Sequence, residues 1–274
     1  MTNIFKERFK DKVIIITGAA RGIGEATALR AAKEGAKLVL VDIREELGQA
    51  VCNRIIKGGG EAIYLNLDIS KEECAEIMVE KTIEKYGRLD AAINNAGVMG
   101  TPHPLHELPK EDMDFTMANN LYSAYFCCKY ELRQFMKQNN GGAIVNNASI
   151  AGVTGLPGNP AYSASKHAVN GLTKNLALDY AKYNIRVNSV NPCGTTTPMV
   201  KEAYDYVKKR IEAAIRAGLD PKEAQSMAGQ KTHSMFTREL LPEEIAASIL
   251  YLISDDATHM TGAIMQTDGG WTSF

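Results

Sequence analysis

The alternation of short apolar runs with longer amphipathic stretches is the feature that most restricts the fold of this chain. Seven runs rich in β-branched residues are separated, in most cases, by segments with helical periodicity. Several of the runs are continuously apolar, which is typical of strands buried on both faces. The pattern therefore predicts an α/β fold in which helices cover both faces of a parallel sheet of about seven strands.

The same pattern places the individual elements. Strands are expected at residues 13–17, 37–42, 62–66, 89–94, 143–147, 185–190 and 263–267, and helices at 22–34, 45–57, 71–86, 112–138, 160–182 and 242–253. No composition shift marks a linker, so we expect one domain over residues 1–274.

Residues 198–240 interrupt this rhythm with charged sequence of helical propensity. Long insertions in compact domains tend to be functional, so we expect a helical insertion on the substrate side that acts as a lid. A surface helical hairpin or an oligomer contact is the alternative.

Charge and residue usage exclude several kinds of partner. With 31 basic and 32 acidic residues the net charge is -1, which gives no footprint for nucleic acid or for an anionic membrane. The charged N-terminus lacks the apolar core of a signal peptide and no run approaches a membrane span, so a soluble, cytoplasmic protein is expected. The five cysteines form no CxxC pair, and His103 and His106 lack neighbouring ligands, so no metal site is expected.

A glycine-rich segment, Thr17-Gly-Ala-Ala-Arg-Gly-Ile-Gly24, follows the first expected strand and leads into a helix. Glycines allow the backbone to approach a pyrophosphate, and the free N–H groups at the start of the helix attract its charge. The spacing is GxxxGxG, which differs from the GxGxxG of the common dinucleotide fingerprint. The segment is interpreted as a phosphate-binding loop.

Asp42 ends the second expected strand, eighteen residues after Gly24. A carboxylate in this register accepts hydrogen bonds from the adenosine ribose and repels a 2′-phosphate. This favours NAD over NADP as the cofactor, while the nearby cations Arg21 and Arg44 keep NADP open as the less favoured choice.

Tyr162 and Lys166 lie four residues apart in an expected helix, so their side chains share one face. A nearby ammonium favours a phenolate, so Lys166 should lower the pKa of Tyr162 from its ordinary value of about 10. Such a tyrosine is an acid/base catalyst. The alternative is an ordinary exposed pair, since tyrosine and lysine one turn apart are common on solvated helices.

These segments together resemble the short-chain dehydrogenase/reductase family over nearly the whole chain. The family implies a single Rossmann-type, doubly wound domain with a seven-stranded parallel sheet, NAD(P) as cofactor, and commonly a homotetramer or homodimer. The resemblance rests on seven motifs in order: Thr17-Gly-x-x-x-Gly-x-Gly24, Asn94-Asn-Ala-Gly97, Asn120, Ser149, Tyr162-x-x-x-Lys166, Asn191-Pro192 and Asp268-Gly-Gly270.

The resemblance implies a role for each residue of the expected catalytic set. Tyr162 looks like the general acid/base, Lys166 like the residue that holds the nicotinamide ribose, and Ser149 like the hydrogen-bond partner of the substrate oxygen. Asn120 resembles the position that anchors a water-linked proton relay to Lys166. Asn119, beside it, makes this last choice ambiguous, although the register favours Asn120.

The expected cofactor contacts follow from the same resemblance. Asp68 looks like the adenine contact, and Thr195 and Thr197 match positions that contact the carboxamide. The full expected set is Gly18, Arg21, Gly22, Ile23, Gly24, Asp42, Asp68, Ile69, Asn95, Ala96, Gly97, Tyr162, Lys166, Pro192, Thr195 and Thr197.

Two positions depart from the family pattern. Cys193 stands where glycine normally packs against the nicotinamide. A thiol there either tilts the ring or narrows the pocket, or is tolerated because cysteine is small. Asn147-Ala-Ser149 stands where two adjacent serines are more common, and the thirteen-residue spacing to Tyr162 still identifies Ser149 as the catalytic serine.

The expected function is an NAD-dependent oxidoreductase that interconverts a secondary alcohol and its ketone. A catalytically silent dinucleotide-binding regulator is the alternative. Apolar side chains suggest a pocket for a hydroxysteroid or another bulky cyclic alcohol, whereas a polyol or sugar fits if they are merely core. They are Met99, Pro102, Leu105, Met199, Met227, Met235 and Phe236.

The segment from Pro160 to Tyr183 is apolar over more of its circumference than one sheet-facing stripe needs. A second buried face is expected on this helix, which favours a homotetramer or homodimer. The expected partner is a small-molecule alcohol or ketone substrate.

Overall fold

A seven-stranded, entirely parallel sheet forms the centre of the protein in a computed structural model that describes residues 4–226, 235–236 and 238–273. The strand order is β3-β2-β1-β4-β5-β6-β7, which confirms the predicted parallel sheet. The strands are β1 (Val13–Thr17), β2 (Lys37–Asp42), β3 (Glu61–Asn66), β4 (Ala91–Asn94), β5 (Gly142–Asn147), β6 (Ile185–Pro192) and β7 (Ile264–Thr267).

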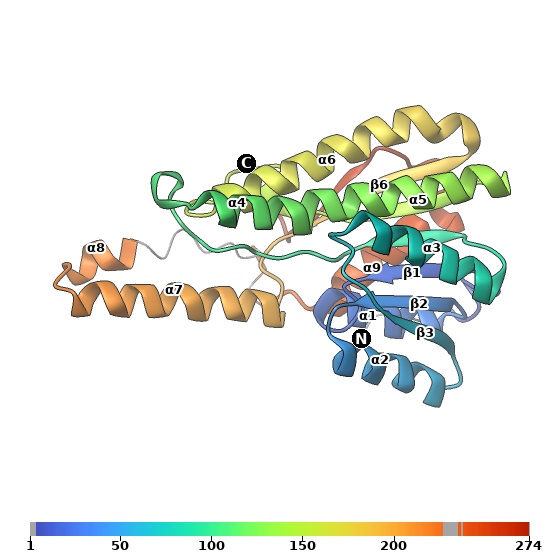
Figure 1. The fold of residues 1–274 in the computed structure, drawn as a ribbon, viewed down its shortest axis with the longest axis horizontal. Coiled ribbons are helices and arrows are strands. Elements are labelled where there is room, and N and C mark those ends of the chain that lie inside the picture. The colour runs from blue at the N-terminus through green and yellow to red at the C-terminus, as the bar shows by residue number, and fades with distance from the viewer. Residues whose placement is uncertain (1–3, 227–234, 237, 274) are drawn as a thin grey trace.

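Helices pack on both faces of this sheet (Figure 1). One face carries α1 (Gly22–Lys33), α2 (Glu45–Lys57) and α9 (Pro242–Ile253), and the other carries α3 (Glu72–Tyr86), α5 (Ser123–Gln138) and α6 (Pro160–Tyr180). In the insertion, α7 (Pro198–Arg216) and α8 (Pro221–Ser226) extend away from the sheet (Figure 1). None of the helices in the described part of the chain is long and apolar enough to span a membrane.

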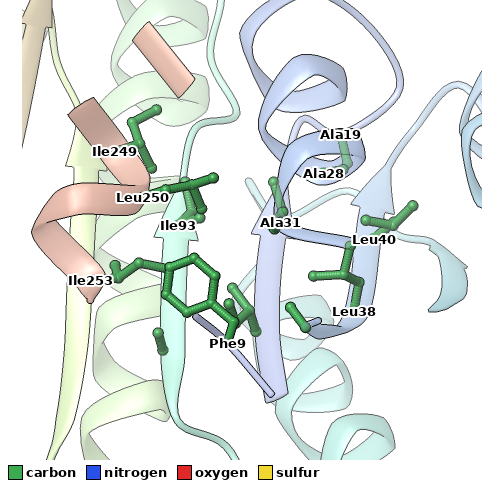
Figure 2. Close-up of a cluster of buried hydrophobic side chains, with 14 of the residues drawn as sticks. Phe9, Ala19, Ala28, Ala31, Leu38, Leu40, Ile93, Ile249, Leu250 and Ile253 are labelled. Atoms are coloured by element: carbon green, nitrogen blue, oxygen red, sulfur yellow. The ribbon is translucent and has the colours of Figure 1, made fainter. Parts of the chain in front are cut away.

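The alternation of side chains along the strands divides the core into two layers. In β1, Ile14 and Ile16 belong to the cluster shared with α1, α2 and α9, whereas Ile15 belongs to the cluster shared with α3 and α5. Figure 2 shows part of the first cluster, which includes Phe9 and Leu250. Burial of one apolar side chain of this size stabilises the fold by about 1.5–3 kcal/mol. Side chains on both faces of β1 therefore stabilise the packing of helices on both sides of the sheet.

The predicted helix over residues 112–138 is in fact three segments. α4 (Lys110–Met117) leads into a π-helical turn over Ala118–Tyr122, and α5 follows without a break. A π turn inserts one extra residue and often occurs at functional sites. Here it contains Asn120, one of the residues expected in the catalytic set.

A buried polar cluster lies between the sheet and α5, centred on Glu131, whose side chain is inaccessible to solvent. The Asn94 amide donates hydrogen bonds to Glu131 Oε2 and Asn146 Oδ1, both at 3.1 Å. Glu131 Oε1 and Asn94 Oδ1 are buried without a hydrogen-bond partner among the described residues. Burial raises the pKa of Glu131 to about 8, so the carboxyl is mostly neutral at neutral pH.

Glu131 should make the free energy of unfolding fall as the pH rises from its unfolded pKa to its folded pKa of about 8. In that window the folded protein binds more protons than the unfolded chain does, and folding is therefore weakened by each rise in pH. Glu131→Gln cannot ionise, so it should be more stable than the parent by about 2–4 kcal/mol near pH 8.5 and nearly equal to it near pH 5.

Urea unfolding of both proteins at several pH values measures this difference. Glu80→Gln, on the exposed side of α3, is the matched control and should leave the pH slope unchanged. Parallel pH slopes for the parent and Glu131→Gln would contradict the prediction.

Candidate active site

A continuous cleft runs along the carboxyl ends of the strands. The segments that follow β1, β2, β3, β4, β5 and β6 line it together with the first turns of α7. Parallel strands gather their carboxyl ends at one edge, and this edge is where open α/β sheets bind ligands.

The glycine-rich segment forms the turn between β1 and α1 at this edge. Gly18 and Gly22 have φ values of 63° and 60°, in the left-handed region that favours glycine. A Cβ at Gly18 would lie 2.9 Å from Ala96 Cα, and one at Gly24 would lie 2.1 Å from Gly18 O. The loop is therefore a close-packed cradle at a helix N-terminus, which fits a pyrophosphate.

Asp42 contacts this cradle and is almost fully buried. Its Oδ2 accepts a hydrogen bond from Ala20 N at 3.1 Å, and its Oδ1 accepts from Arg44 N at 3.0 Å and Arg44 Nη1 at 3.3 Å. Backbone N–H groups of the glycine-rich loop and of the segment after β2 therefore hold the carboxylate in place. Its position beside the cradle fits the ribose end of a dinucleotide.

Ser149, Tyr162 and Lys166 converge on the cleft from the end of β5 and the first turns of α6. They are 8%, 6% and 5% exposed. Asn159 caps α6 by accepting a hydrogen bond from Tyr162 N at 3.3 Å. Lys166 Nζ lies 5.6 Å from the centre of the Tyr162 ring and donates to the backbone oxygen of Asn147 at 2.9 Å.

The expected lowering of the Tyr162 pKa by Lys166 is wrong for this structure. Burial raises the pKa of Tyr162, and the hydrogen bond with Ser149 opposes that rise only in part. Burial also lowers the pKa of Lys166 to about 8. The physical reason is desolvation, which disfavours both charged forms and outweighs an ammonium directed at a carbonyl oxygen.

Asn120 is buried and does not line the cleft, whereas the neighbouring Asn119 does. Its amide accepts a hydrogen bond from Val98 N at 2.8 Å and donates to Val98 O and Ser165 Oγ, both at 3.0 Å. Asn120 therefore joins the segment after β4 to α6, next to Lys166. The proton relay remains a prediction.

Gly97 makes this close arrangement possible. A Cβ there would lie 2.8 Å from Asn120 Oδ1 and 3.5 Å from Lys166 Nζ. The small residue expected at the end of β4 thus leaves room for the two side chains behind it.

The other predicted cofactor residues line the cleft, with one exception. Gly24 is buried in the packing between α1 and the loop. Residues that line the cleft but were not predicted include Val41, Ile43, Leu67, Ser70, Val98 and Ala148. Each of them is adjacent in the sequence to a predicted residue at the carboxyl end of a strand. They could therefore have been predicted from their position relative to the strands.

Cys193, one of the two positions that depart from the family pattern, lines the cleft and is buried. Its Sγ donates to Asp268 O at 3.3 Å, and burial raises the pKa of the thiol to about 11. The cysteine is therefore a neutral thiol tied to the backbone after β7.

The expected apolar substrate wall is only partly correct. Met99, Pro102 and Met199 line the cleft, but the exposed side chains of Leu105, Met235 and Phe236 do not, and Met227 lies outside the described residues. The wall is completed by Leu156, Pro157, Ala203, Tyr204 and Val207. The last three share one face of α7, a spacing that sequence periodicity could have identified.

Comparison with known proteins gives a consistent result along the whole chain. Residues 18–272 match the family model described as enoyl-(acyl carrier protein) reductase. The chain is 43% identical over 269 residues to a 3beta-hydroxysteroid dehydrogenase of Mediterraneibacter gnavus, and this match covers 97% of each chain.

Two solved structures share the fold. The crystal structure of levodione reductase superposes with a TM-score of 0.85 at 33% identity, covering 97% of this chain and 99% of that one. The crystal structure of 3-ketoacyl-(acyl-carrier-protein) reductase from Brucella melitensis, complexed with NADH, superposes with a TM-score of 0.81 at 28% identity. This match covers 96% of this chain and 99% of that one.

Proposed function

The chain belongs to the short-chain dehydrogenase/reductase family, and on that premise we propose that it transfers a hydride between NAD(H) and a secondary alcohol or its ketone. The observation that carries the proposal is the convergence of Ser149, Tyr162 and Lys166 on the cleft that also holds the glycine cradle and Asp42. Members of this family act on alcohol and ketone groups with a nicotinamide dinucleotide.

The residues that would hold the dinucleotide are divided along the cleft. The cradle from Gly18 to Gly22 would bind the pyrophosphate, Asp42 the adenosine ribose, and Asp68 the adenine. When bound, the nicotinamide supplies or accepts the hydride, and the protein provides position and electrostatics. Asp42 favours NAD because a 2′-phosphate beside it would be repelled.

Tyr162 would exchange the proton with the substrate oxygen. In alcohol oxidation its phenolate accepts the hydroxyl proton, and in ketone reduction its phenol donates one. Ser149 would donate a hydrogen bond to the same oxygen, where charge develops during the reaction. Lys166, close to Tyr162 and tied to Asn147 O, would hold the nicotinamide ribose.

A hydroxysteroid or another bulky cyclic alcohol is the proposed substrate. The cleft that Tyr162 lines is also lined by Met99, Met199, Tyr204 and Val207, and such a wall suits a large apolar ligand. The hydroxysteroid dehydrogenase relative supports the same class. Values of kcat/KM for hydroxysteroids and for polyols test the choice, and we expect hydroxysteroids to be preferred. A preference for polyols would overturn it and favour the sugar alternative.

The value of kcat/KM for alcohol oxidation should rise with pH, because the reaction requires the phenolate form of Tyr162 and burial raises the pKa of this phenol. Below that pKa, kcat/KM for the alcohol should rise about tenfold per pH unit, while kcat/KM for ketone reduction should stay nearly flat because the phenol is already protonated. Initial rates in both directions between about pH 6 and pH 9 measure this. An oxidation profile that does not rise with pH would contradict the assignment of Tyr162 as the base.

We also propose that the outer face of α6 is covered by a second copy of the chain. Leu178 on this helix is 81% exposed in the single chain, and Phe115 and Tyr125 on α4 and α5 are 55% and 43% exposed. Light scattering should give two or four times the chain mass of 29.9 kDa, and Leu178→Glu should lower it. A parent protein that scatters as a single chain at micromolar concentration would contradict this proposal.

A further inference from the structure

The insertion helix α7 begins in contact with the phosphate cradle. A Cβ at Gly22 would lie 3.3 Å from Thr197 Cγ2, and Thr197 caps α7 by accepting a hydrogen bond from Val200 N at 3.3 Å. The helix that lines the proposed substrate pocket, α7, therefore packs against the loop that would bind the pyrophosphate.

A bidentate ion pair lies across the same junction. Arg21, the residue that precedes α1, donates from Nη2 to Glu202 Oε2 at 2.8 Å, and its Nη1 donates to Glu202 Oε1. The two residues are 181 positions apart in the sequence, and their side chains are 23% and 61% exposed. Both terminal nitrogens of the guanidinium are therefore directed at one carboxylate.

The second cation at this end of the cleft is also paired with a carboxylate. Arg44 donates to Asp42 Oδ1 from its backbone and its guanidinium. The hydrogen bond from Arg21 lowers the pKa of Glu202, and the charges of Arg21 and Arg44 add to this lowering. Arg21 and Arg44 both line the cleft. Both guanidinium groups can form charge-assisted hydrogen bonds with a phosphate.

We propose that Glu202 is a specificity-determining residue that acts with Asp42 to select a dinucleotide without a 2′-phosphate. Glu202 occupies the fork of Arg21 and adds a negative charge beside the adenosine end of the cleft. A 2′-phosphate there meets two carboxylates, and both nearby guanidinium groups already donate to a carboxylate. The inference rests on the proposed function, since it requires that the cleft bind a dinucleotide.

The expected effect is selective because NAD lacks the group that Arg21 would bind. Glu202→Gln keeps the size of the side chain, removes its charge and leaves Arg21 free to turn toward a 2′-phosphate. We expect the ratio of the dissociation constants for NADPH and NADH to fall about tenfold, chiefly through tighter NADPH binding, as one added charge-assisted contact at a partly exposed site would give. The difference should shrink in high salt.

Isothermal titration calorimetry of the full chain with NADH and with NADPH is the test, since it measures binding without turnover. Glu212→Gln removes the same charge from an exposed position farther along α7 and should leave the ratio unchanged. Arg21→Ala in the Glu202→Gln background should cancel the gain, because the proposal assigns that gain to Arg21.

The outcomes separate this inference from the function on which it rests. A parent protein that binds neither dinucleotide would overturn both. A parent that binds NADH, with the same ratio in Glu202→Gln, would overturn the selectivity role alone. Equal losses of affinity for both dinucleotides in Glu202→Gln would also overturn it, because they would assign Glu202 to holding α7 against the cradle.

Discussion

Tyr162→Phe is expected to lower kcat for alcohol oxidation and ketone reduction by about a thousandfold while leaving dinucleotide affinity within about twofold. The phenol is the group proposed to exchange the proton with the substrate oxygen, and positioned acid/base groups contribute about 10²–10⁴ in rate. Its side chain is 6% exposed beside Ser149 and Lys166. Removing one oxygen leaves the ring in place, so packing should change little.

Tyr180→Phe is the matched control, since it makes the same change near the end of the same helix, outside the cleft. Steady-state rates and calorimetric titration of NADH should be measured on the parent and both variants. A Tyr162→Phe protein that retains more than about a tenth of the parent kcat would contradict the acid/base role.

Gly24→Ala is expected to weaken dinucleotide binding by about a hundredfold or more and to lower the free energy of unfolding by about 1–3 kcal/mol. The added Cβ would lie 2.1 Å from Gly18 O and 2.7 Å from Asn95 Nδ2, so α1 must move away from the cradle. Both effects follow from the same displacement, because the first turn of α1 carries the backbone N–H groups that would bind the pyrophosphate.

Gly58→Ala provides the comparison for this substitution. Gly58 caps the C-terminus of α2 with a negative φ, and a Cβ there would lie 3.4 Å from Arg54 O and from Ile55 O, which is an ordinary contact. Titration with NADH and urea unfolding should show parent-like values for this variant. Parent-like affinity in Gly24→Ala would contradict the account of the cradle.

The sheet and the outline of the site were predictable because both depend on local pattern. Continuous apolar runs specify buried parallel strands, and the ends of those strands then bring Asp42, Asn95 and Pro192 to one edge. The motif spacings of Ser149, Tyr162 and Lys166 were enough to place them together.

What could not be predicted depends on long-range contacts or on solvation. The pair of Arg21 and Glu202 joins residues 181 positions apart, and no local rule connects them. The side chain of Asn120, in the π turn, bonds with Val98 and Ser165, which lie 22 and 45 positions away in the sequence. The pKa of Tyr162 was misjudged because the helical spacing reveals the neighbouring ammonium but not the burial that outweighs it.

The most direct test of the central claim is the transfer of a labelled hydride. The purified full chain would be incubated with NAD and a 3β-hydroxysteroid that carries deuterium on its carbinol carbon, and the reduced nucleotide would be analysed by mass spectrometry. We predict one deuterium in each molecule of reduced nucleotide, formed in equal amount with the ketone. Binding of NAD without any labelled nucleotide, across hydroxysteroids and other cyclic secondary alcohols, would contradict the account.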